Sequence, residues 1–260
     1  MLIINADDFG FSTIINEAII KCFREGLCSS TTIMPNMPAF EEACQLSHEH
    51  KLINHIGMHM VLKDGMPLTE KIKRFSRFCD EEGYLKLSRR WPILYLAIDE
   101  KEVLAEEIRA QIKRCRDSGL PLTHIDSHHH IHTEWAIASV LIDIAREQNI
   151  PYIRLSRNCK PNVNLLKLFY KNIFNMRLQY ANLARTRYFG SLADYFFAVK
   201  KKGRVTTNDS FEVMIHPILN ENNMLVEGII ASNLTKAIQE VNDYHNAVSF
   251  SGAKYEPNEQ

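Results

Sequence analysis

The sequence THIDSHHHIH (residues 123–132) joins the end of a short predicted strand to a cluster of histidines. The strand, Leu122–Asp126, stands between two predicted helices. One is Asp99–Ser118, whose apolar residues recur at helical spacing until Gly119, and the other is Glu134–Gln148. A strand set between helices in this way is the repeating unit of folds built on parallel strands.

The same alternation extends over most of the chain, so the sequence predicts an α/β fold. Short apolar runs predict six more strands, at Leu2–Ala6, Cys28–Met34, Ile53–Met60, Tyr152–Leu155, Phe211–Ile215 and Ala247–Phe250. Helical spacing of apolar residues predicts helices at Ser12–Gly26, Pro38–His48, Asn162–Asn182 and Ala231–Tyr244. About seven strands in 260 residues favour a closed or partly closed barrel. An open doubly wound sheet is the alternative.

Residues 63–98 are the least regular part of the chain. They contain Gly65, Pro67, Gly83 and Pro92, which predict a long loop with short helices. Loops of this length commonly cover active sites. The chain has no internal repeat or low-complexity segment, so we expect a single catalytic domain over residues 1–260, with a loose polar tail after about residue 252.

The composition excludes several classes of partner. Basic and acidic residues are balanced at 31 each, so no charge excess indicates a nucleic acid or an anionic membrane.

The chain shows no secretory signal pattern and no apolar stretch near the ~20 residues that span a bilayer, so we expect a cytoplasmic protein. Its six cysteines form no CxxC motif and are expected to be buried thiols.

Five of the eleven histidines fall within nine consecutive residues of the opening stretch. Neutral imidazole is the commonest metal ligand in proteins near neutral pH, so this density indicates a metal site. Because the side chains of a strand alternate, we expect His128 and His130 on one side and His129 on the other. Asp126 and Ser127 are placed to orient a ligating imidazole from behind.

Asp7 and Asp8 follow the first predicted strand. Two carboxylates held close together resist joint ionisation unless a cation lies nearby. In one arrangement that keeps both ionised, one carboxylate binds a metal and the other acts as a general base. The alternative is a polar turn with a helix cap, which is a common place for aspartate.

Three further polar residues stand at or near strand ends: His59, Arg154 and His216. In a barrel the carboxyl ends of the strands converge on one face, where these side chains would meet the two aspartates and the histidine cluster. His216, placed away from the metal, suits a general acid. Arg154 is suited to hold a carboxylate base in position or to bind an anionic group of the substrate. Together these residues predict a mononuclear metal centre that assists attack of water on a carbonyl or phosphoryl centre.

Taken in order, these motifs resemble those of the YdjC/ChbG-type carbohydrate deacetylases. The resemblance covers roughly Leu2 to Phe250 and is strongest in the histidine motif. The residues that carry it are Asn5-Ala6-Asp7-Asp8-Phe9-Gly10, Ser29-Ser30-Thr31-Thr32, Gly57-Met58-His59, the run from His124 to His132, Arg154 and Met214-Ile215-His216-Pro217. The combination of the first motif with the histidine motif is specific.

The resemblance implies a distorted (β/α) barrel related to the polysaccharide deacetylases. It implies hydrolysis of the N-acetyl groups of acetylated amino sugars, such as chitooligosaccharides or their phosphates. The family is described with one divalent metal, usually magnesium, and zinc also fits this ligand set. Carried over by position, Asp8, His59 and His128 would bind the metal. Asp7 would be the general base, and His216 would be the acid for the leaving amine.

The remaining candidate residues would contact the substrate or support these groups; they are Asp126, Ser127 and Arg154. The expected partner is a small carbohydrate, with no nucleic acid and no membrane. A homodimer is expected only from the frequency of two-fold dimers among soluble proteins. The sequence leaves open the identity, length and phosphorylation of the sugar.

Two other functions stay open at the level of sequence. A metal-dependent phosphoesterase would use related chemistry, commonly with two metals and therefore more carboxylate ligands. A non-catalytic sugar-binding protein would keep the fold and the metal without turnover. Asp7 and His216 argue against the binding protein, which needs neither residue.

Overall fold

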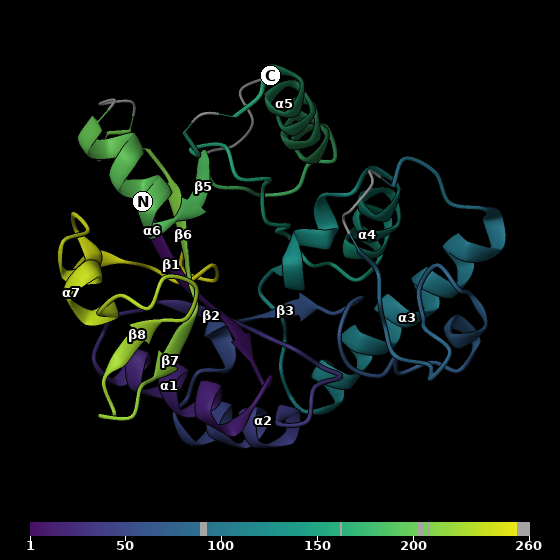
Figure 1. Cartoon of the computed structure of the whole chain (residues 1–260), viewed down its shortest axis with the longest axis horizontal. Coiled ribbons are helices and arrows are strands. Elements are labelled where there is room, and N and C mark those ends of the chain that lie inside the picture. The colour runs from purple at the N-terminus through teal and green to yellow at the C-terminus, as the bar shows by residue number, and fades with distance from the viewer. Residues whose placement is uncertain (89–92, 162, 202–204, 207–208, 254–260) are drawn as a thin grey trace.

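The computed structural model of the protein describes residues 1–88, 93–161, 163–201, 205–206 and 209–253. Within these ranges, six parallel strands form one sheet in the order β4-β3-β2-β1-β6-β5. The strands are β1 (Leu2–Phe9), β2 (Ser30–Ile33), β3 (Ile56–Met60), β4 (Ile125–Ser127), β5 (Tyr188–Ser191) and β6 (Phe211–Ile215). The sheet is a curled half-barrel with helices packed around it (Figure 1). This confirms the predicted α/β fold, a distorted barrel.

Four helices follow the first four strands along the chain, which is the alternation predicted from the sequence. They are α1 (Thr13–Arg24), α2 (Phe40–Glu49), α3 (Ile98–Asp117) and α4 (Trp135–Glu147). Three more helices lie in the second half of the chain: α5 (Leu165–Tyr180), α6 (Leu192–Phe196) and α7 (Leu234–Gln239).

The first strand and helix show why these residues fold this way. β1 opens with an apolar run in which Ile3 and Ile4 are fully buried, as expected for a parallel strand covered on both faces. The hydroxyl of Ser12 accepts a hydrogen bond from the backbone N–H of Ile15 and so caps α1. The apolar side of α1 then packs into the core that lies against the sheet.

Residues 152–158 lie between the two edge strands of the sheet, β4 and β5. The N–H of Arg154 donates to the carbonyl of Ile125 in β4 at 3.0 Å, and the N–H of Asn158 donates to the carbonyl of Phe189 in β5 at 3.2 Å. The strand predicted in this segment is present only as isolated parallel bridges. The segment nevertheless carries Arg154 into the interior of the half-barrel, where its side chain is fully buried.

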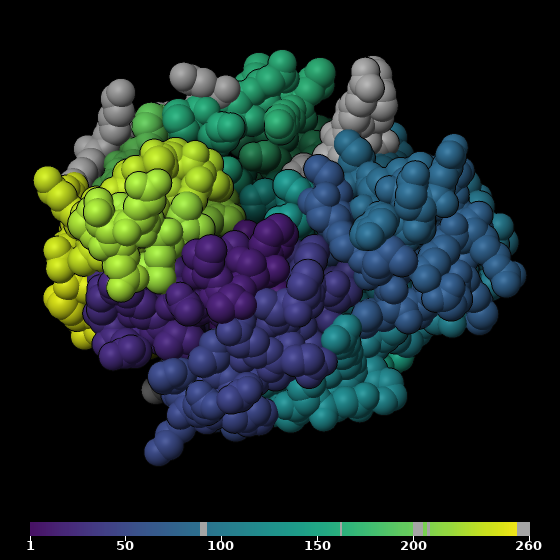
Figure 2. Space-filling view, turned by 60° about the horizontal axis from the view of Figure 1, so that its bottom comes forward, coloured from purple at the N-terminus to yellow at the C-terminus, as the bar shows by residue number. Residues whose placement is uncertain are grey.

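A small antiparallel sheet stands beside the main one. It consists of β7 (Pro217–Leu219) and β8 (Leu225–Glu227), and it follows β6 directly. The ammonium group of Lys21 on α1 donates a hydrogen bond to the carbonyl of Asn223 in the connecting turn, at 2.7 Å. In the space-filling view, this C-terminal part (yellow-green) lies on one side of the N-terminal residues (purple), and the long loop (blue) lies on the other (Figure 2).

In its described residues, 63–88 and 93–97, the long loop is largely irregular, as expected from the sequence, with a short 3-10 helix at Lys71–Arg74. It ends one residue earlier than predicted, because α3 begins at Ile98. The buried carboxylate of Glu107 in α3 accepts hydrogen bonds from the backbone N–H groups of Leu68 and Thr69, at 3.0 and 2.9 Å. These bonds anchor the loop to the helix.

Two predictions near the C-terminus are wrong. Ala247–Phe250 is not a strand, although the N–H of Val248 donates to the carbonyl of Leu2 at 2.9 Å. Of the helix predicted over Ala231–Tyr244, only Leu234–Gln239 (α7) is helical. Ala231 and Asp243 adopt left-handed backbone, through which a helix cannot continue. The loose tail expected after residue 252 falls mainly on residues 254–260, which lie outside the described residues.

Strands β5, β7 and β8 and the short helix α6 were not predicted. β7 and β8 have three residues each, too few for a period to be recognised. β5 contains Gly190, which weakens the strand pattern. Tertiary pairing with β6 therefore determines β5 more than its own sequence does.

Candidate active site

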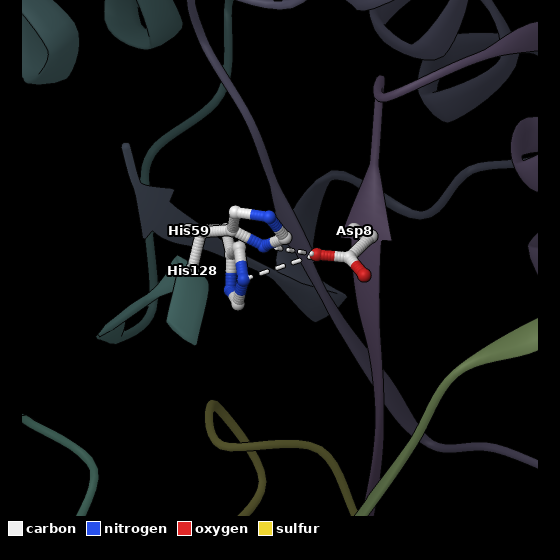
Figure 3. A group of neighbouring side chains, drawn as sticks. All are labelled: Asp8, His59 and His128. Carbon is white, nitrogen blue, oxygen red and sulfur yellow. Dashed lines mark hydrogen bonds and ion pairs between the residues drawn. The ribbon is translucent and has the colours of Figure 1, made fainter. Parts of the chain in front are cut away.

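Three side chains meet at the carboxyl end of the sheet, one each from β1, β3 and the residue after β4. The Oδ1 atom of Asp8 lies 3.2 Å from Nε2 of His59 and 3.0 Å from Nδ1 of His128. Figure 3 shows both rings turned toward this one carboxylate oxygen. Two imidazole nitrogens and a carboxylate oxygen so close together can be bridged by a metal ion.

The backbone at Asp8 explains how this carboxylate reaches the two rings. The pairing of β1 with β2 shifts register between Ala6 and Phe9, and Asp8 within this shift has a φ of 73°. Irregularities of this kind re-aim a side chain next to an active site. Left-handed backbone is unfavourable for most residues, but aspartate is one of the few that adopt it.

His59 is held from behind by a buried carboxylate. Strands β3 and β4 pair with His59 opposite Asp126, and Nδ1 of His59 lies 2.6 Å from Oδ1 of Asp126. Burial alone would lower the pKa of His59, but the charges of Asp126 and Asp8 outweigh it and raise the pKa to about 10. Because Asp126 holds Nδ1, the other ring nitrogen is presented to the site.

Asp7 lies beside this group and is paired with Arg154. The guanidinium donates from Nη1 to Oδ2 of Asp7 at 2.6 Å and from Nη2 to Oδ1 at 2.8 Å, and the amide of Asn5 donates to Oδ1 at 2.9 Å. Burial alone would raise the pKa of Asp7, but Arg154 outweighs it and lowers the pKa below its usual value. Arg154 also pairs with Asp126, so one cation joins the supports of Asp7 and His59.

Glu212 on β6 fixes the third side of the Arg154 guanidinium. Its Oε1 atom accepts a hydrogen bond from Nε of Arg154 at 2.5 Å, and its Oε2 atom accepts one from the hydroxyl of Tyr152 at 2.6 Å. The ring of Phe189 lies 4.8 Å from the guanidinium carbon. Burial raises the pKa of Glu212 to about 7, although Arg154 and Tyr152 act in the opposite direction.

His216 faces Asp7 from the other side, directly after β6. Its Nε2 atom lies 4.0 Å from Oδ2 of Asp7. Glu227 on β8 accepts a hydrogen bond from the backbone N–H of His216, at 3.0 Å, and lies 3.2 Å from its Nδ1 atom. Burial would lower the pKa of His216, but this contact and the charges of Asp7 and Asp8 outweigh it and raise the pKa.

The other histidines of the cluster lie outside this group of three, although the ring of His129 packs on that of His128, with 4.1 Å between the centroids, and forms a second set of possible metal donors with His128 and Asp64. The alternation expected for residues 128–130 is wrong, because β4 ends at Ser127 and His129 and His130 have left-handed φ angles of 55° and 57°. The ring of His129 faces Asp64, with 3.3 Å between Nε2 and Oδ2. The ring of His130 lies edge-on to a buried aromatic side chain.

The structure brings seven of the eight predicted site residues into one connected group. The exception is Ser127, whose hydroxyl lies 2.7 Å from Nδ1 of His132 and accepts a hydrogen bond from the His132 backbone N–H at 2.8 Å. It therefore shapes the turn after β4. The seven that meet are Asp7, Asp8, His59, Asp126, His128, Arg154 and His216.

Sequence reasoning gave no role to five supporting residues: Asn5, Thr32, Tyr152, Glu212 and Glu227. Glu212 had a recognisable signal, because it is the one charged residue in the apolar strand Phe211–Ile215. Glu227 had none, since it acts through a hairpin too short to recognise.

A family model described as YdjC-like protein matches residues 1–247. The chain belongs to the YdjC-like protein family. This confirms the resemblance found in the sequence motifs.

Several relatives of this YdjC-like protein carry names that state an activity. A chitooligosaccharide deacetylase of Proteus mirabilis is 31% identical over 243 residues, covering 91% of this chain and 88% of its own length. A carbohydrate deacetylase of Halalkalibacterium halodurans is 30% identical over 233 residues, covering 87% and 91%. A carbohydrate deacetylase of Brevibacillus brevis is 40% identical over 150 residues, covering 58% of this chain and 57% of its own length.

The fold of the YdjC-like protein is also similar to a solved structure from Enterococcus faecalis. That protein, described as a candidate cellobiose-phosphate cleavage protein, superposes with a TM-score of 0.66 at 22% identity, covering 95% of both chains. This likeness supports the fold alone. Among the described residues, no helix is both long enough and apolar enough to cross a membrane.

Proposed function

We propose that this protein is a metal-dependent carbohydrate N-deacetylase that hydrolyses the N-acetyl groups of acetylated amino sugars. The observation that carries the proposal is the convergence of Asp8, His59 and His128, with Asp7 and His216 at the same end of the sheet. The names of the relatives support the same reaction class. Chitooligosaccharides or their phosphates are the substrates we favour.

The residues of the site fit one divalent metal. The buried guanidinium of Arg154 pairs with Asp7, Asp126 and Glu212, whereas Asp8 faces the imidazoles of His59 and His128. A divalent ion held by Asp8 and the two imidazoles would take the place of the proton that the raised pKa of His59 favours in the absence of metal. The family resemblance favours magnesium, whereas two imidazoles among three donors suit zinc. A metal held there would supply a Lewis acid that polarises a carbonyl and lowers the pKa of water.

Asp7 is placed to act as the general base. The bidentate contact with Arg154 keeps its carboxylate ionised, so it can accept a proton from a water that attacks the acetyl carbon. A depressed pKa makes a carboxylate a weaker base. Arg154 therefore holds Asp7 in position and in the ionised form at the expense of basicity.

His216 is placed to act as the general acid. The Glu227 contact and the charges of Asp7 and Asp8 raise the pKa of His216 and so favour the protonated imidazole, and Glu227 holds Nδ1 so that Nε2 faces Asp7 across the site. As the C–N bond breaks, His216 gives its proton to the sugar nitrogen. One water is consumed, and the products are acetate and the free amino sugar.

The test is acetate release from N,N′-diacetylchitobiose and from its 6-phosphate, measured with purified protein. We expect release that stops after EDTA treatment and returns with Mg²⁺ or Zn²⁺. The metal content per chain, measured in parallel, should be one. No acetate from either sugar with metal bound would overturn the proposal, and release of inorganic phosphate in place of acetate would identify a phosphoesterase.

A further inference from the structure

The ring of His128 has a second nitrogen that the group formed with Asp8 and His59, here called the inner group, does not use. Its Nδ1 atom is turned toward Asp8, whereas its Nε2 atom lies 3.6 Å from Oδ2 of Asp64 in the long loop. The same carboxylate oxygen lies 3.3 Å from Nε2 of His129. One donor atom from each of Asp64, His128 and His129, here called the outer group, lies within 4.8 Å of the others.

The backbone explains why the outer group gathers at one place. Because β4 has ended and His129 has a left-handed φ of 55°, the rings of His128 and His129 lie side by side with their centroids 4.1 Å apart. Asp64 is held within the long loop, where its N–H donates to the carbonyl of Leu85 at 2.8 Å and the N–H of Leu85 donates to the carbonyl of Gly65 at 2.9 Å. The backbone of the loop thus fixes Asp64 opposite the two rings.

The separations in the outer group suit the ligands of a zinc ion. At 3.3 and 3.6 Å, both contacts of the Asp64 carboxylate exceed the roughly 2.7–3.2 Å of a typical N–H···O hydrogen bond. Donors about 2.0–2.1 Å from a tetrahedral zinc ion lie about 3.3–3.4 Å from one another. Two imidazoles with one carboxylate suit zinc, whereas magnesium prefers oxygen ligands. The outer group therefore offers three donors to zinc and leaves a position for water.

The outer group should bind zinc more weakly than the inner group. The side chains of Asp64 and His129 are 50% and 46% exposed, whereas those of Asp8 and His59 are 16% and 2% exposed. Solvent weakens the attraction between an ion and an exposed carboxylate. The positive charge of Lys63 also acts on His129 and opposes a cation there. Zinc should therefore fill the inner group first.

His128 cannot serve both groups in one protonation state. A neutral imidazole has one nitrogen free to act as a ligand, and the other nitrogen carries a proton. When Nδ1 binds an ion in the inner group, the proton lies on Nε2, on the side of Asp64. When Nε2 binds an ion in the outer group, the proton must lie on Nδ1, which is 3.0 Å from Oδ1 of Asp8. Each ion should weaken the binding of the other, because coupling between two sites is reciprocal.

We propose that the outer group is a second, weaker zinc site, which competes with the inner group for His128 and inhibits the protein when zinc is in excess. One ion is bound when metal and protein are equal in amount, and the second only at higher zinc. Filling the outer group moves the proton of His128 from Nε2 to Nδ1 through solvent and leaves Asp8 and His59 as the donors of the inner ion. The loss of activity rests on the function proposed above, whereas the second binding step does not.

The first test counts zinc ions and needs no activity. Zinc is titrated into the metal-free full chain by calorimetry, and the bound ions are counted after equilibrium dialysis. We expect two steps in the wild type, the second weaker. His129→Ala should keep the first step and weaken the second by more than the roughly 10–100-fold that loss of a supporting group costs, and Asp64→Asn should weaken the same step.

The matched control is His50→Ala, which removes an exposed histidine at the end of α2 and should keep both steps. Far-ultraviolet circular dichroism confirms that each variant is folded. A single zinc per chain in the wild type, or a second step as tight in His129→Ala as in the wild type, would overturn the proposed site.

The second test follows the proton of His128. Nitrogen-15 spectra of the histidine side chains show which ring nitrogen carries it. We expect the proton on Nε2 with one zinc per chain and on Nδ1 with zinc in excess. In His129→Ala it should stay on Nε2. A wild-type His128 that keeps its proton on Nε2 while the second zinc binds would reject the competition.

Activity is measured on the same preparations. Acetate release from N,N′-diacetylchitobiose should rise with the first zinc and fall as the second binds. The fall should be absent in His129→Ala and should not be reproduced by excess Mg²⁺. Undiminished release with both ions bound would reject the inhibition. No release at any zinc concentration, with both binding steps and the proton shift present, would reject the deacetylase function and confirm the second site.

Discussion

The two halves of the candidate site are supported in different ways. The metal half, Asp8, His59 and His128, stands on or directly after strands of the main sheet. Behind it lie the fully buried carboxylate of Asp126 and guanidinium of Arg154, and the side chain of His59 is only 2% exposed. Its supports are fixed charges, each held by more than one partner.

The acid half, His216 with Glu227, is joined to the small two-stranded sheet beside the main one. His216 is 21% exposed, and its partner Glu227 comes from β8. A general acid must give up a proton and regain it in every turnover, which requires access to solvent. The difference suggests that rigid burial serves the groups whose charge must not change, and that partial exposure serves the group whose charge must.

Removing a ligand should break the metal half completely. His59→Ala deletes one of three donors, so divalent-metal affinity should fall by more than the roughly 10–100-fold that loss of a supporting group costs. Acetate release should fall to background. Calorimetric titration with Zn²⁺ and Mg²⁺ measures the affinity. His50→Ala is the control, because this exposed residue lies at the end of α2 outside the group, and it should keep both properties. Equal losses in the two variants would contradict the ligand assignment.

Removing the base should separate chemistry from metal binding. In Asp7→Asn the amide keeps the size of the side chain but cannot take a proton, so kcat should fall by about 10²–10⁴ while the metal stays bound. Metal analysis and initial rates on the same preparation check this. A rate within a few-fold of the wild type would show that another group is the base.

Changing the support of the acid should shift the pH dependence. Glu227→Gln removes a charge that raises the pKa of His216, so the imidazole loses its proton at lower pH. The alkaline fall in kcat should move to lower pH, and kcat at neutral pH should drop by about tenfold, less than full loss of an acid costs. Glu221→Gln, in the exposed β7–β8 turn, is the control and should leave the profile unchanged. An unshifted alkaline limb in Glu227→Gln would exclude this role.

The far side of the buried network should affect stability and no group that takes part in the reaction. The pKa of Glu212 is raised from 4.5 to about 7 in the folded protein, so the folded state holds a proton that the unfolded state has lost. Its contribution to stability is complete below about pH 4.5 and is lost as the pH rises toward 7. Glu212→Gln mimics the protonated acid and should remove that loss, on the order of 3 kcal/mol at most.

Chemical denaturation of metal-free protein between pH 4.5 and 8 measures this difference. Comparing wild type with Glu212→Gln cancels the pH dependence of Asp7 and Asp8, whose lowered pKa values act in the opposite direction and at lower pH. Parallel stability curves for the two proteins would show that Glu212 is ionised throughout.

Much of the fold and of the site could be predicted because local patterns of apolar and polar residues determine it. The apolar runs before Asp7, His59 and His216 place each residue at a strand end, and parallel strands bring those ends together. What the sequence hides is pairing across the sheet. That His59 stands opposite Asp126 follows from strand register, which no single strand specifies.

The supports of Arg154 and His216 were harder to predict for a physical reason. Glu212 and Tyr152 meet only because residues 152–158 bridge the edge strands, and Glu227 reaches His216 only through a hairpin of three-residue strands. Contacts made by short or irregular segments carry no period. The outer face of α5 is the reverse case, since the spacing of Leu166, Phe169 and Met176 is visible in the sequence but only their exposure in the structure shows that they are not core.

The left-handed backbone of Asp8 has a consequence for how this position can evolve. The residue must supply a carboxylate oxygen and also adopt a φ of 73°, and few amino acids meet both requirements. A library at position 8 selected for folding alone should accept asparagine and glycine, which tolerate this backbone. The same library selected for activity should return aspartate alone. Glutamate, its nearest chemical relative, should be lost under selection for activity, because its longer side chain would carry the carboxylate past the two imidazoles, so a substitution that looks conservative is not.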